Sequence, residues 1–121
     1  MRIFAKKKMN KFTSFEEFYP YYLMEHRDPL NRLFHYIGSL FVIVLFLMFL
    51  VSRMPIFLFL MPIFGYGFAW YGHFKIEKNR PATFKHPFYS LASDFVMLYH
   101  FFTFEIDKKI KEAEEKIKTP N

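Results

Sequence analysis

The side chains of this 121-residue chain best suited to chemistry are its five histidines. His73 and Glu77 are four residues apart, so on a helix they share one face. Pro81 ends that helix, because the residue before a proline is pushed out of helical geometry. A histidine beside a carboxylate at the end of a long apolar helix is costly, and such groups near a bilayer indicate a functional site.

Two more histidines flank the start of an earlier helix. Asp28 and Pro29 predict an N-cap and a first helical position, which places His26 in the turn just before the helix. Asn31 and His35 are four residues apart on its first turns and face the same way.

Two apolar helices would position these histidines. Residues 37–52 and 55–71 contain no charged residue, and each is at the short end of the roughly 17–25 residues that cross a bilayer. With Arg53 at the tip, we expect a helical hairpin over 28–52 and 55–77. A soluble, buried hairpin is the alternative, but this short chain has too little other material to cover both helices, so we favour the membrane.

The N-terminal part predicts a tail and a short helix. Residues 1–12 are basic and should be solvated or bind lipid headgroups. Ser14 and Glu17 form a capping box for an amphipathic, interfacial helix over 14–25, in which Pro20 predicts a kink or a break.

The C-terminal part reads as one long helix over 88–118, apolar at first and then amphipathic and rich in Lys and Glu. We therefore predict an all-α fold, a membrane helical bundle of about four helices with a central transmembrane hairpin. The bundle should form a single membrane-embedded domain over residues 1–121.

Composition supports a membrane protein. Hydrophobic residues make up 53% of the chain and aromatic residues 23%, above the norm for soluble domains. The absence of cysteine excludes disulfides and thiolate metal sites. A net charge of +6 beside long apolar runs favours anionic membrane lipids as partners, and we expect no nucleic-acid partner.

Charge also predicts the orientation of the hairpin. Lys and Arg cluster before residue 36 and again after the second apolar run, and positive residues stay cytoplasmic. We expect an integral membrane protein, in the inner membrane if bacterial or the endoplasmic reticulum if eukaryotic. Its N-terminus and its 74–87 loop should be cytoplasmic.

That orientation brings His26, His35 and His73 to one surface, with His86 as a fourth candidate and His100 left as structural. Any one histidine alone would more simply make a single hydrogen bond, so the hypothesis depends on their convergence. Several imidazoles with open coordination positions are typical of non-haem Fe(II) sites. Three side chains could orient such ligands from behind: Asn31, Glu77 and Asp94.

In combination, several blocks of the chain resemble a family of small membrane proteins, formerly described only as a domain of unknown function, that includes the endoplasmic-reticulum 2-hydroxy-fatty-acid dioxygenase. The resemblance covers residues 14 to 104. It rests on residues 18–26, 31–39, 72–84, 86–87 and 93–95, which include Glu-His, Asn-Arg-x-x-His and Gly-His-x-x-x-Glu-Lys-Asn-Arg-Pro-Ala.

The resemblance implies Fe(II) held by His26, His35 and His73, with His86 as a further candidate. It implies alpha-oxidation, in which a 2-hydroxy fatty acid and O2 give a fatty acid one carbon shorter. For the substrate carboxylate, Arg80 and Arg32 are the best candidates, because a guanidinium binds it through two parallel hydrogen bonds.

Two other interpretations stay open, and a homo-oligomer is compatible with all of them. One is a di-metal membrane lipid hydroxylase or desaturase, although such enzymes use paired histidine boxes and no two adjacent histidines occur here. The other is a non-enzymatic membrane scaffold, which would need only the hairpin and the basic loops.

Overall fold

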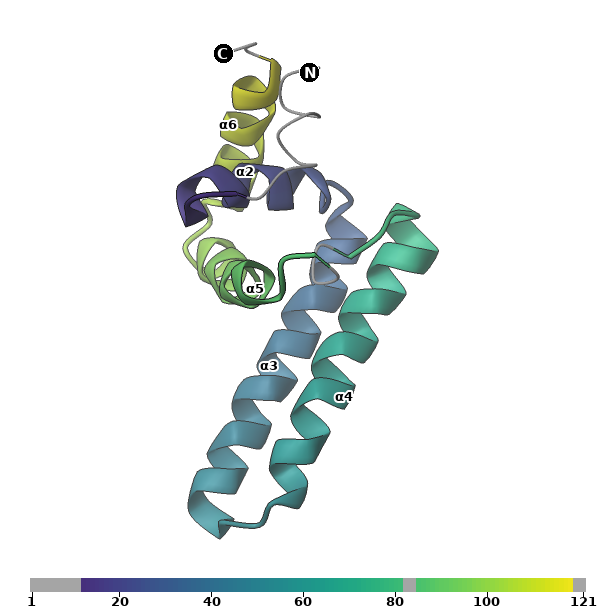
Figure 1. The fold of residues 1–121 in the computed structure, drawn as a ribbon, viewed down its shortest axis with the longest axis vertical. Helices are drawn as coiled ribbons and strands as arrows, with labels where there is room; N and C mark the ends of the chain where they lie inside the picture. Colours follow the sequence, from purple (N-terminus) through teal and green to yellow (C-terminus); the bar gives the residue numbers. More distant parts are fainter. Residues whose placement is uncertain (1–11, 82–84, 119–121) are drawn as a thin grey trace. The chain divides into compact units, whose positions relative to one another are not determined.

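The computed structural model describes residues 12–81 and 85–118, and every regular element in these ranges is helical (Figure 1). The predicted all-α class is therefore confirmed. By its contacts the chain divides into two compact units, where the sequence predicts a single domain over 1–121. One unit is residues 28–81, and the other combines the segments before and after it.

The unit of residues 28–81 is the predicted hairpin. Helix α3 (Pro29–Ser52) packs along α4 (Ile56–Tyr71), which continues into a π-helical segment, η1 (Gly72–Glu77) (Figure 1). Asp28 caps α3, since its side chain accepts a hydrogen bond of 2.9 Å from the backbone N–H of Leu30. The predicted bounds of 28–52 and 55–77 agree with these helices.

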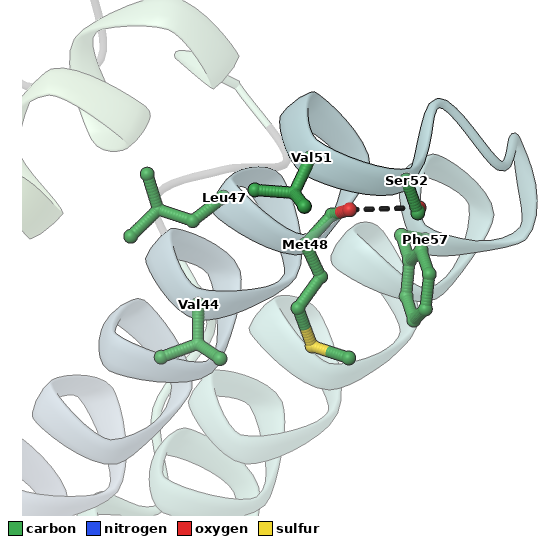
Figure 2. A pocket seen from close by; sticks show the side chains of 6 residues that line it. All are labelled: Val44, Leu47, Met48, Val51, Ser52 and Phe57. Atoms are coloured by element: carbon green, nitrogen blue, oxygen red, sulfur yellow. Dashed lines mark hydrogen bonds between the residues drawn. The ribbon is translucent and has the colours of Figure 1, made fainter.

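Both arms of the hairpin are long and apolar enough to cross a bilayer: α3 over Pro29–Ser52 and α4 with η1 over Ile56–Glu77. Large apolar side chains cover their outer surfaces, with Val51 88% and Phe59 69% exposed. At the tip, Val44, Met48 and Phe57 help to line an apolar hollow (Figure 2). These features support a membrane location, and the orientation stays a prediction.

The other unit contains α2 (Phe15–Met24), α5 (Pro87–Phe102) and α6 (Ile106–Lys118). Ser14 caps α2 as predicted, accepting from the Glu17 N–H at 3.2 Å. Of the kink or break predicted at Pro20, the break is wrong, because the helix continues through Pro20 to Met24. Of the predicted basic tail over 1–12, all but Phe12 lies outside the described residues.

The predicted single helix over 88–118 is also wrong. In the structure α5 ends at Phe102. The chain then turns at Phe104, whose φ of 62° lies in the left-handed region. The physical reason is burial: α6 packs against α2 and buries a stripe of Ile106, Ala113 and Ile117. A straight continuation of α5 would leave this stripe without a partner, so tertiary packing favours the turn.

Candidate metal centre

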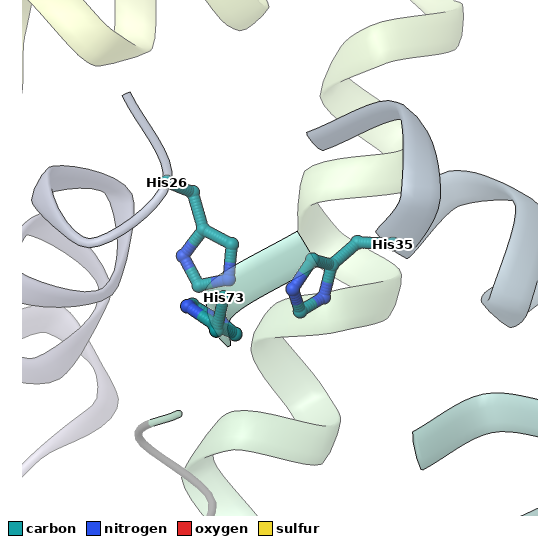
Figure 3. Close-up of side chains that lie close together, drawn as sticks. All are labelled: His26, His35 and His73. Carbon is teal, nitrogen blue, oxygen red and sulfur yellow. The ribbon is translucent and has the colours of Figure 1, made fainter. Parts of the chain in front are cut away.

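Two buried histidines lie together within the hairpin unit. His35 on α3 is 5% exposed and His73 on η1 is 1% exposed. Their ring centroids are 4.8 Å apart with the rings nearly perpendicular (Figure 3). A ring nitrogen of His35 lies within 4.8 Å of a ring nitrogen of His73, close enough for both to bind one metal ion.

A close helix contact sets this pair side by side. Gly72 opens η1, and a Cβ at this position would lie 2.0 Å from the Oδ1 of Asn31 on α3. Any other residue here would displace the Asn31 amide from its present position. Asn31 is one helical turn before His35, and Gly72 directly precedes His73, so this contact fixes the spacing of the two imidazoles. Irregular π-helical turns are frequent at functional sites.

Glu77 ties the end of η1 to the start of α3. Its Oε1 accepts hydrogen bonds from the Asp28 backbone N–H at 2.9 Å and from Asn31 Nδ2 at 3.1 Å. The sequence places Asn31 and Glu77 behind the histidines as orienting groups. The structure shows them bonded to each other, so they position the helices that carry His35 and His73.

The side chain of Asn79 orients His73 directly. His73 Nδ1 and Asn79 Oδ1 are 2.7 Å apart, and the Asn79 backbone N–H donates to the His73 carbonyl at 3.0 Å. Because Oδ1 only accepts, Nδ1 carries the proton and the ring's lone pair is on Nε2. The sequence alone does not identify Asn79 as a partner of His73. The one sequence feature that pointed to it was the position of this amide just past the end of a predicted helix.

His26 belongs to the other unit and is fully buried. Its Nδ1 lies 2.6 Å from the Tyr22 carbonyl, so it too carries a proton on Nδ1 and a lone pair on Nε2. Its ring stacks on Tyr22 at a centroid distance of 4.0 Å, and the Tyr22 hydroxyl donates to Asp94. Asp94 therefore accepts a hydrogen bond from the residue whose ring stacks on His26.

Three buried imidazoles are therefore candidate metal ligands, His35 and His73 in the hairpin unit and His26 in the other unit (Figure 3). His86 lies outside this group. Its ring packs edge-on to Phe12 and Phe18 at centroid distances of 5.2 and 5.3 Å. Burial, and then the charge of Lys85, lower the pKa of His86, which keeps it neutral in this aromatic setting.

His100, which the sequence leaves as structural, lies on α5 and contacts Tyr19 of α2. The Tyr19 hydroxyl and the Nδ1 of His100 form a hydrogen bond of 2.8 Å. Burial and then Lys109 lower the pKa of His100, against the smaller opposing effects of Glu105 and Glu112. Through its hydrogen bond with Tyr19, His100 connects α5 to α2.

The two predicted carboxylate-binding arginines differ in setting. Arg32 is only 7% exposed and lies on α3 three residues before His35, so the two share a helix face. Arg80 is exposed, just past η1, where it lines a hollow with other basic residues. Of the two, only Arg32 is buried.

Comparison with known proteins gives one match. A family model described as 2-hydroxy-palmitic acid dioxygenase Mpo1-like matches residues 12–106, which is most of the chain. No curated protein and no solved structure gives a significant match.

Proposed function

The chain belongs to the 2-hydroxy-palmitic acid dioxygenase Mpo1-like family, and from this premise we propose that it is an Fe(II)-dependent dioxygenase of 2-hydroxy fatty acids. The observation that carries the proposal is the buried pair of His35 and His73, with the tautomer of His73 set by Asn79. The reaction would remove one carbon from the carboxyl end of the substrate.

The histidines fit such a metal. His73 and His26 both hold a proton on Nδ1 through an oxygen acceptor, which directs the Nε2 lone pair toward a ligand. His26 lies two residues before Asp28, and the Asp28 N–H is bonded to Glu77 at the end of η1. Two residues of chain reach only about 7 Å, so His26 must stay near the start of α3. We propose these three imidazoles as the ligands, with iron supplying O2 activation when bound.

The other residues would bind and orient the substrate. The Arg32 guanidinium is the proposed partner of the carboxylate, because it offers two parallel N–H donors on the His35 face of α3. A 2-hydroxy acid and one O2 balance to the acid one carbon shorter, CO2 and water, so the conversion needs no separate reductant.

Metal analysis of the full chain tests the proposal. Protein purified without oxygen in mild detergent and loaded with Fe(II) should hold about one iron per chain. His73→Ala should lose it, whereas His100→Ala, a matched control outside the group, should keep it. The loaded wild type should convert a 2-hydroxy fatty acid to the acid one carbon shorter, and His73→Ala should not.

Three results would overturn this reading. Two irons per chain would favour a di-metal hydroxylase, and no metal after Fe(II) loading would favour a membrane scaffold. Equal loss of iron from the His73 and His100 variants would mean that folding, and not ligation, was affected.

A further inference from the structure

A basic hollow lies at the end of the second apolar arm of the hairpin. It measures about 480 Å³, and its lining residues are Phe74, Lys75, Lys78, Asn79 and Arg80. All three cations are exposed, and the lining contains no acidic side chain. Three positive charges around one concavity, whose lining residues include no carboxylate, favour binding of an anion.

An apolar groove precedes this hollow on the same helix. It also measures about 480 Å³ and is lined by Phe34, Ile63, Phe64, Gly67, Phe68 and Tyr71. At Gly67 a Cβ would meet no atom within 4 Å, so the groove is open there. Tyr71 in the groove and Phe74 in the hollow are one turn apart, so the two concavities follow each other along α4 and η1.

We propose that these two concavities bind one anionic phospholipid, with the phosphate in the basic hollow and an acyl chain in the groove. The hollow lies where the segment Ile56–Glu77, long enough to span a bilayer, comes to its end. That is the level of the lipid headgroups, and basic pockets at this level bind anionic lipid headgroups. Lys75 and Lys78 offer the compact charges that suit a phosphate.

The lipid site is separate from the proposed substrate site but touches it at one residue. Asn79 lines the hollow, and its Oδ1 is bonded to Nδ1 of His73. A bound lipid should therefore hold the loop that sets the tautomer of His73. The lipid site does not require the enzymatic proposal, because it depends only on charge and shape.

Counting bound lipid by native mass spectrometry tests this inference. The full chain is equilibrated with mixed micelles that contain either phosphatidylglycerol or phosphatidylcholine. We expect one phosphatidylglycerol retained per chain and no phosphatidylcholine. A hollow variant, Lys75→Gln with Lys78→Gln and Arg80→Gln, should bind phosphatidylglycerol on the order of 100-fold more weakly, at about a fivefold loss per charge.

A charge-matched control separates a site from general attraction. Lys108, Lys111 and Lys116 are exposed on α6 in the other unit, and changing all three to Gln removes the same charge. This control should retain phosphatidylglycerol like the wild type. Equal losses in the two triple variants, or no loss in the hollow variant, would overturn the proposal.

Two further arms identify the ligand. Gly67→Phe fills the groove and should weaken phosphatidylglycerol binding at least tenfold, while the hollow still takes up glycerol phosphate. Displacement of the lipid by equimolar inorganic phosphate would show that the acyl chain contributes nothing, and would overturn the lipid assignment. Displacement by an equimolar fatty acid, but not by a second phospholipid, would assign the hollow to the substrate and overturn it as well.

Discussion

The contact between Gly72 and Asn31 gives the sharpest prediction about how the hairpin holds its histidine pair. Gly72→Ala would place a Cβ 2.0 Å from Asn31 Oδ1 and 3.0 Å from its Cγ, where ordinary contacts are 3.4–4 Å. The amide can escape only by turning. That movement takes Asn31 Nδ2 away from the Glu77 carboxylate, which it now meets at 3.1 Å.

Two quantities set the size of the effect. Losing a hydrogen bond to a charged group costs about 1.5–3 kcal/mol of unfolding free energy. Alanine gains about 1 kcal/mol over glycine within a helix. Gly72→Ala should therefore destabilise by about 0.5–2 kcal/mol. Gly67→Ala, a matched control with nothing within 4 Å of its Cβ, should show only the gain.

The assay is reversible unfolding of the full chain in mixed micelles with a denaturing detergent, followed by helical circular dichroism. Helix propensity cancels between the two variants, so Gly72→Ala should be less stable than Gly67→Ala by about 1.5–3 kcal/mol. In an Asn31→Ala background the clash is gone, and Gly72→Ala should then stabilise by about 1 kcal/mol. Equal stability of the two glycine variants, or the same Gly72 effect in both backgrounds, would refute the reasoning.

Three other predictions concern single residues. Asn79→Ala should weaken Co(II) or Fe(II) binding about 10–100-fold, because His73 loses the acceptor that sets its tautomer. Asn79→Asp should restore most of the affinity, and equal affinities in a metal titration would contradict the assignment. Tyr22→Phe removes the bond to Asp94 and should cost about 1.5–3 kcal/mol in the same unfolding assay, and an unchanged midpoint would argue against that bond. The pKa of His100 in the folded chain lies below its usual 6.5, so the unfolded chain binds more protons there and stability falls as pH drops through about 6.5. His100→Gln should flatten this fall, and a parallel pH profile of the unfolding midpoint would show that another group causes it.

Local signals in the sequence were enough for the main elements. The caps at Ser14 and Asp28 and the uncharged runs on either side of Arg53 predict α2 and the hairpin close to their observed bounds. They succeed because a cap is satisfied by neighbours within three residues and apolar length is read directly from the chain. The helix starts also place His35 and His73 at the same end of the hairpin, where the structure brings their rings together.

Contacts between distant segments decided the rest. The turn at Phe104 forms because α6 buries its apolar stripe of Ile106, Ala113 and Ile117 against α2. No local sequence pattern predicts a left-handed backbone conformation at a phenylalanine. Gly72 acts on the site through Asn31, a partner on another helix that packing supplies. Sequence alone therefore determined that α2 and the hairpin helices form and which histidines could meet, since both follow from periodicity and capping. Tertiary structure decided how closely the His35 and His73 rings approach, because that depends on ångström-scale packing between α3 and η1.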